Sequence, residues 1–122
     1  NNFLNSFFER EIKVKLIYPL PEVGWNLSKL NMVNKIFRGG IPEEVSTSFK
    51  VFLKRQNFSY YALNSVKKNS LLEKINLDSV FCNQDLKDRC IAQIDGIPLY
   101  YDSNHLTNKG AEVLIKNTNL VK

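Results

Sequence analysis

The residues of this chain with the clearest capacity for chemistry are Asp102 and His105, three positions apart in the segment 100–107. His105 is the only histidine in the sequence. An irregular turn between a strand and a helix can bring the carboxylate of Asp102 to the Nδ1–H of His105. Nε2 is then free to take a proton from a nucleophile, as in Ser-His-Asp sites. Because this spacing is common in proteins, an alternative stays open: Asp102 only caps the turn and His105 is a solvated loop residue.

Four further residues have types that suit a site of this kind. Ser103 adjoins the pair, but its neighbours leave no room for a separate oxyanion hole, so we do not expect it to be the nucleophile. Trp25 could line a sugar site because aromatic faces pack on sugar rings, or it could anchor its own loop. Glu22 could orient substrate or the histidine loop, or accept a hydrogen bond that closes its own loop. Tyr100 and Tyr101 alternate faces along a strand, so we expect one in the core and the other at the border of the site, and we take Tyr101 as the candidate binding residue.

The alternation of apolar and polar residues predicts an α/β chain that positions these side chains. The expected elements are the end of a helix over 1–11, a strand over 12–20, a long loop with one helical turn over 22–42, helices over 46–68 divided near 57–59, a short helix over 71–75, a strand over 77–81, a hairpin of 91–94 and 98–101, and a helix over 108–116. Asp95-Gly96 is the turn of the hairpin. Thr107 is expected to cap the last helix, and Gly110 to be small because a side chain there would clash with the sheet.

The length and composition describe one globular domain that lacks part of its sheet. A chain of 122 residues with 43% hydrophobic and 24% charged residues is typical of a single globular unit. Two strands and a hairpin are few for this many helices, since parallel strands occur almost only in larger sheets with both faces covered. The first residue is Asn1 rather than Met. We therefore expect residues 1–122 to be part of a larger fold.

The charge balance excludes little by itself. Seventeen basic and twelve acidic residues give a net charge of +5, but the lysines are scattered and form no basic stripe with interleaved aromatics. We therefore do not expect nucleic-acid binding, although a basic cytoplasmic nucleic-acid-binding module remains an alternative that predicts reduced cysteines. No apolar run approaches the roughly 18 residues that cross a bilayer.

The two cysteines, Cys82 and Cys90, bracket the polar loop 83–89. No second Cys or His pair lies nearby, so a four-ligand zinc site is not expected, and no C-x-x-C redox motif is present. Two free thiols or one local disulfide remain. An even count in one polar loop favours the disulfide, which would place the chain in an oxidising compartment.

Three segments resemble one known family. Residues 99–111, Leu-Tyr-Tyr-Asp-Ser-Asn-His-Leu-Thr-Asn-Lys-Gly-Ala, resemble the C-terminal block of SGNH (GDSL-like) hydrolases. The likeness is greatest to SGNH domains fused to bacterial membrane acyltransferases that O-acetylate surface polysaccharides. Residues 17–26, Ile-Tyr-Pro-Leu-Pro-Glu-Val-Gly-Trp-Asn, and the paired cysteines ahead of Gly-Ile-Pro-Leu-Tyr-Tyr at 96–101 resemble further markers of this group. The resemblance covers about residues 12–116 and is loose over 43–75.

The resemblance implies a fold and a division of the site. The fold is a partial three-layer α/β/α sandwich of the flavodoxin-like SGNH type. His105 would be the general base and Asp102 the residue that orients it. The family's nucleophile lies in a Gly-Asp-Ser block near the start of the domain, and none of the five glycines here precedes Asp-Ser. Residues 1–122 are therefore expected to be the C-terminal part of one SGNH domain, without the nucleophile-bearing N-terminal part, and inactive alone.

The resemblance also implies partners and a location. It predicts O-acetyl transfer to a cell-surface polysaccharide on the periplasmic side of the inner membrane, to which a membrane acyltransferase domain would tether the protein. The upstream half of the domain is the expected partner, and the exposed sheet edge makes a homodimer or domain swap possible. No metal or organic cofactor is implied. The alternatives are a carbohydrate acetylesterase and a non-catalytic envelope domain that binds glycan or protein.

Overall fold

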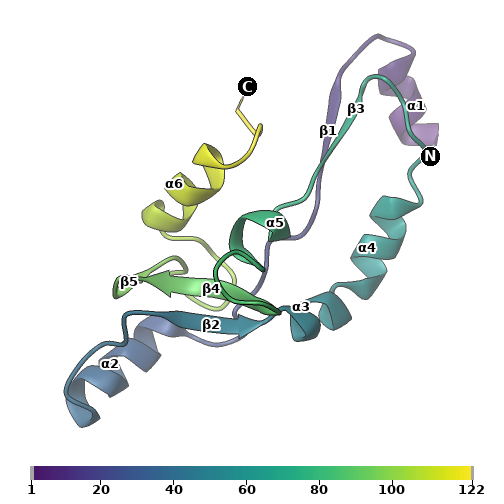
Figure 1. The fold of residues 1–122 in the computed structure, drawn as a ribbon. Coiled ribbons are helices and arrows are strands. Elements are labelled where there is room, and N and C mark those ends of the chain that lie inside the picture. The colour runs from purple at the N-terminus through teal and green to yellow at the C-terminus, as the bar shows by residue number, and fades with distance from the viewer. Residues whose placement is uncertain (1, 122) are drawn as a thin grey trace.

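The computed structural model describes residues 2–121, which form a mixed α/β chain with two small sheets. In chain order the elements are α1 (Asn2–Phe8), β1 (Val14–Ile17), α2 (Leu27–Phe37), β2 (Val45–Ser48), α3 (Phe49–Arg55), α4 (Asn57–Asn64), β3 (Leu72–Ile75), α5 (Asp78–Phe81), β4 (Arg89–Ile94), β5 (Ile97–Pro98) and α6 (Asn108–Lys116). Figure 1 shows β1 and β3 extending away from the other strands, with α1 at their far end. The predicted α/β class with few strands is confirmed.

β1 and β3 form a parallel two-stranded sheet, in which Val14 pairs with Leu72 and Ile17 with Ile75. The strand predicted over 12–20 is thus confirmed in its middle. Among the described residues each of these strands pairs only with the other, so each has one unpaired edge.

Two neighbouring predictions are wrong. Residues 71–75 contain β3 rather than a helix, and residues 77–81 contain the short helix α5 rather than a strand. Leucine, glutamate and lysine favour helices by only a few tenths of a kcal/mol each, so pairing with β1 outweighs this preference. Asp78 and Ser79 favour turns and helix starts over strand interiors.

The second sheet is antiparallel and has the order β2-β4-β5. Asp95 and Gly96 join β4 to β5 with φ angles of 51° and 73°, as the predicted hairpin turn requires. The helical region predicted over 46–68 is correct for α3 and α4, which meet at Gln56, but its first residues form β2. Ser48 ends that strand and caps α3 by accepting a hydrogen bond from the Val51 N–H.

The long loop predicted over 22–42 is also wrong, because residues 27–37 form α2. The Asn26 side chain caps this helix by accepting from the Lys29 N–H. The face of α2 that is buried contains Leu27, Asn31 and Asn34, and Asn31 donates from Nδ2 to Oε1 of Gln93 on β4 at 2.5 Å. The opposite, exposed face carries apolar residues, namely Met32, Val33, Ile36 and Phe37. Because apolar residues occur on both faces and asparagines interrupt the buried one, a search for apolar periodicity misses this helix.

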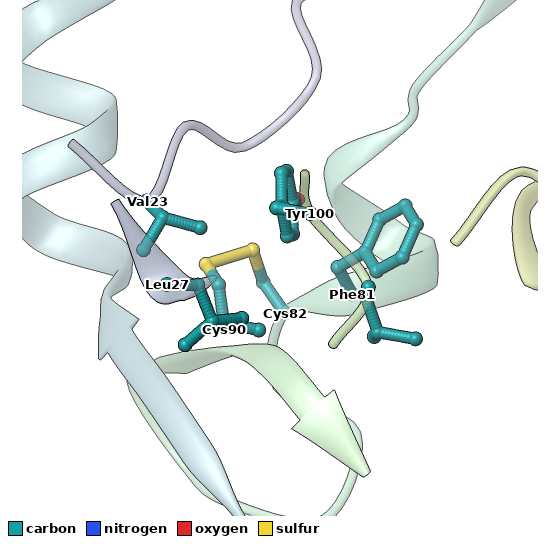
Figure 2. Packing of buried hydrophobic residues seen from close by; sticks show 8 residues of the cluster. Val23, Leu27, Phe81, Cys82, Cys90 and Tyr100 are labelled. Carbon is teal, nitrogen blue, oxygen red and sulfur yellow. A yellow bond between two sulfur atoms is a disulfide. The ribbon is translucent and has the colours of Figure 1, made fainter. Parts of the chain in front are cut away.

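The core is built around a disulfide between Cys82 and Cys90. Both cysteines are almost fully buried, with 3% and 1% of their surface exposed. Figure 2 shows the sulfur atoms between Val23 and Leu27 on one side and Tyr100 on the other. The disulfide expected from the sequence is present and joins α5 to β4.

Reduction of this disulfide is expected to lower the free energy of unfolding by about 2–3 kcal/mol, because an open loop of this length gains conformational entropy in the unfolded chain. Urea unfolding with and without a phosphine reductant measures the difference. A Cys82→Ala/Cys90→Ala double variant is the control and should not respond to the reductant. Equal midpoints for the oxidised and reduced wild-type chain would contradict the prediction.

Candidate functional site

The candidate site lies on a tight loop between β5 and α6. An antiparallel bridge between Tyr100 and Leu106 closes this loop, and the Tyr101 N–H donates to the carbonyl of His105 at 2.8 Å. Thr107 then begins α6 as predicted, since its Oγ1 accepts from the Gly110 N–H at 3.1 Å. The same hydroxyl donates to the carbonyl of Pro98 at 2.8 Å. The hairpin and the helix therefore hold both ends of the loop.

Within the loop, Asp102 and His105 are in direct contact. Oδ2 of Asp102 lies 2.7 Å from Nδ1 of His105. Oδ1 of the same carboxylate accepts from the backbone N–H groups of Asn104 and His105, at 2.9 and 2.8 Å. The aspartate therefore both caps the turn and holds the His105 ring, and the role of this pair in catalysis stays a prediction.

The geometry leaves His105 open for chemistry. Its side chain is 74% exposed, and Nδ1 is occupied by Asp102, so Nε2 is the nitrogen that can meet another group. A carboxylate on Nδ1 favours the tautomer with a proton there and stabilises the imidazolium formed when Nε2 accepts a proton. The pair can thus act as an oriented base.

The carboxyl of Asp102 is held in its charged form. Its pKa is lowered to about 2, first by the hydrogen bonds from the backbone of Asn104 and His105 and then by the His105 ring. A carboxyl whose folded pKa lies below its unfolded value, about 3.9 for aspartate, stabilises the folded chain above that unfolded pKa. This contribution is lost as the pH falls from about 3.9 through about 2.

A titration followed by carboxyl ¹³C NMR tests this. We expect the Asp102 resonance to keep its ionised position down to about pH 3, where an ordinary aspartate is mostly protonated. In a His105→Ala variant the midpoint should rise but stay below that of an ordinary aspartate, because the two backbone bonds remain. A wild-type midpoint of about 4 would show that the turn is not capped in solution.

A second segment, residues 21–24, is bound to this loop from the other end of the chain. The carbonyl of Ser103 accepts from the N–H groups of Val23 and Gly24, at 2.9 and 3.1 Å. The buried hydroxyl of Tyr100 donates to the carbonyl of Pro21 at 2.6 Å. Burial raises the pKa of this phenol, which therefore stays a neutral donor.

These bonds determine where the predicted binding residues lie. Glu22 and Trp25 flank the two N–H groups that meet Ser103, so the structure brings their segment to the Asp102–His105 loop. Glu22 is half-buried and Trp25 is 37% exposed. Neither side chain forms a hydrogen bond or an ion pair with the Asp102–His105 pair. The sequence prediction did not include the hydroxyl of Tyr100, although a tyrosine assigned to the core needs a buried acceptor.

Tyr101 borders an open groove beside the loop while Tyr100 is buried, although the strand predicted over 98–101 is wrong beyond Pro98, where β5 ends. Tyr101 is 71% exposed, and the groove has a volume of about 500 Å³. The groove is lined by Ile97, Pro98, Tyr101, Leu106, Thr107, Asn108 and Lys109. The lining thus combines one aromatic face with a few polar groups at the start of α6.

Among the described residues, neither a serine bonded to His105 nor a cluster of metal ligands is present. The hydroxyl of Ser103 donates to Oδ1 of Asn104 at 3.2 Å and makes no hydrogen bond to His105. Within residues 2–121 no three His, Cys, Asp or Glu side chains gather to hold a metal ion. No helix in this range is long and apolar enough to cross a membrane.

The fold and the site together define an α/β chain with a hydrogen-bonded Asp–His pair on an exposed turn between a strand and a helix. Residues 2–117 match the model of a family described as SGNH domain (fused to AT3 domains). The chain therefore belongs to this family, as its resemblance predicts, and so to a group of esterase and acyltransferase type that accompanies AT3 acyltransferase domains. No curated protein and no solved structure matches the chain significantly.

Proposed function

We propose that this chain supplies the Asp–His part of a serine-type site in an O-acyltransferase that acetylates a cell-surface polysaccharide. The observation that carries the proposal is the 2.7 Å contact between Asp102 Oδ2 and His105 Nδ1, with the ring otherwise exposed. Membership of the family fused to AT3 domains supports the acyl-transfer chemistry.

In this mechanism a serine hydroxyl attacks the carbonyl carbon of an acetyl donor while Nε2 of His105 takes the hydroxyl proton. Asp102 holds the ring and stabilises the imidazolium. The donor's leaving oxygen departs with the proton from Nε2, which leaves an acetyl-serine. A sugar hydroxyl then attacks this ester, giving its proton to Nε2. The serine regains a proton from Nε2 as the acetylated sugar leaves.

The serine and the oxyanion hole belong, in this proposal, to an upstream part of the same domain, of which residues 1–122 are the C-terminal part. The unpaired edges of β1 and β3 support this division, since strands from an upstream part would extend the parallel sheet. The resulting sheet, covered by helices on both faces, would be the three-layer α/β/α sandwich of the SGNH fold. Pairing of two copies through these edges, as a homodimer or domain swap, stays a prediction.

The polysaccharide acceptor would lie between residues 21–25 and the loop that holds Asp102 and His105, which meet at Ser103. Trp25 and Tyr101 would provide aromatic faces for sugar rings, and Glu22 would accept hydrogen bonds from sugar hydroxyls. The buried disulfide suits an oxidising compartment. We place the domain on the periplasmic face of the inner membrane, tethered by an AT3 membrane domain that provides the acetyl group.

The experiment compares acetyl transfer and hydrolysis by the longer protein that joins this chain to its upstream part. With aryl acetate as donor and an oligosaccharide as acceptor, we expect acetylated oligosaccharide together with release of the aryl alcohol. If the aryl alcohol is released and the acetyl group is found only as free acetate, the protein is a carbohydrate acetylesterase rather than a transferase. No release above background would overturn the proposal and favour a non-catalytic glycan- or protein-binding domain.

A further inference from the structure

We infer that the guanidinium of Arg55 forms a subsite beside the Asp102–His105 loop for a carboxylate on an acidic sugar. The inference rests on the proposed function only in assigning this sugar to the polysaccharide acceptor. Arg55 is the last residue of α3, far in sequence from both Trp25 and Asp102.

The guanidinium lies directly against Gly24. A Cβ built on Gly24 would be 2.5 Å from Nη1 of Arg55 and 3.3 Å from both Cζ and Nη2. Gly24 also has a φ of +80°, a conformation that glycine adopts without strain. Glycine at this position therefore satisfies the backbone and leaves room for the cation.

Gly24 connects this cation to the candidate site. Its N–H donates to the carbonyl of Ser103, the residue that follows Asp102. The next residue, Trp25, is partly exposed and could pack against the ring of a sugar whose carboxylate meets Arg55. One short segment, Gly24 and Trp25, therefore links the Arg55 cation, an aromatic face and the loop that holds Asp102 and His105.

Arg55 has no acceptor of its own in the described part of the chain. Neither Glu22 nor Asp102 forms an ion pair with it, and its five N–H donors make no hydrogen bond within residues 2–121. A planar guanidinium forms two parallel hydrogen bonds with a carboxylate, which a lysine ammonium does not reproduce. The Arg55 guanidinium, which has no acceptor among the described residues and lies at the edge of the proposed sugar site, therefore favours an acidic sugar over a neutral one.

A purely local role for Arg55 is the competing explanation. A basic residue in the last turn of a helix interacts favourably with the helix dipole, and Lys54 in the same turn of α3 has this position too. Lys54 and Arg55 are both exposed, and the close contacts to Gly24 are those of the Arg55 guanidinium alone. Lys54→Gln is therefore a matched control that removes one charge from the same turn.

Isothermal titration of the 122-residue chain with a galacturonate oligomer and with its carboxyl-reduced, neutral form tests the inference. We expect the acidic oligomer to bind at least about tenfold more tightly, and Arg55→Gln to remove that preference. Arg55→Lys should restore only part of it, and Lys54→Gln should change the affinity by less than about twofold. Circular dichroism of each variant confirms that it is folded.

Three results would overturn the inference: equal affinity for the two oligomers, an Arg55→Gln variant that binds like the wild type, or equal losses in Arg55→Gln and Lys54→Gln. The last would assign the binding to the overall positive charge. An inactive longer protein whose chain still prefers the acidic oligomer would contradict the proposed function alone. An active protein without that preference would contradict the subsite alone.

Discussion

Replacing His105 by alanine is expected to lower acetyl turnover by the longer protein by on the order of 10³–10⁴-fold. The reason is that the exposed ring is the only base in contact with Asp102 among residues 2–121, so none of them replaces it when the serine must lose its proton. Aryl-acetate hydrolysis at neutral pH measures the effect. Asp102→Asn should come close to the same loss, since an amide facing Nδ1 favours the wrong tautomer of the ring.

Asn104→Ala is the matched control for these variants. Asn104 lies in the same loop and its side chain is exposed, while its backbone N–H, which the variant keeps, is what Asp102 binds. We expect this variant to keep turnover within about threefold of the wild type, because it removes no group from the reacting pair. Turnover by His105→Ala equal to that of Asn104→Ala would show that His105 is not the base.

Replacing Gly110 by alanine is expected to destabilise the chain by about 2–4 kcal/mol. A Cβ at this position would lie 2.1 Å from the carbonyl oxygen of Leu99 and 2.9 Å from Cδ2 of Leu106. The carbonyl cannot turn away cheaply, because it accepts from the Thr107 N–H at 2.9 Å. α6 must instead move away from Leu99, and the loop that holds His105 moves with it. Urea unfolding measures the loss.

Gly40→Ala separates this clash from the general effect of adding a methyl group. A Cβ on Gly40 would meet no heavy atom within 4 Å. We expect its unfolding free energy to stay within about 0.5 kcal/mol of the wild type. Equal destabilisation by the two variants would mean that the contact between α6 and Leu99 does not limit stability. A wild-type-like Gly110→Ala variant would contradict the predicted clash directly.

The parts of the site that the sequence predicted correctly depend on neighbours along the chain. The Thr107 cap, the start of α6 and the Asp95-Gly96 turn each need contacts that span only a few residues. The Asp102–His105 contact belongs to the same group, because a carboxylate three residues before a histidine can close its own turn. Such interactions form in nearly any fold that tolerates the turn.

The parts that the sequence predicted wrongly depend on partners far along the chain. Residues 72–75 favour a helix by themselves and become a strand because β1, nearly 60 residues earlier, offers a parallel edge. α2 buries Asn31 because the side-chain amide of Gln93 on β4 accepts its hydrogen bond, a partner that no local pattern shows.

Residue types at short spacing were enough to predict the α/β class, the last helix, the hairpin turn and the contact between Asp102 and His105. Only the tertiary structure brought Gly24 to Ser103 and laid Arg55 over Gly24. Contacts across 30 to 80 residues depend on how α3, residues 21–24 and the loop that holds Asp102 and His105 pack together. Their free energy is shared among many weak contacts, and no single spacing in the sequence encodes it.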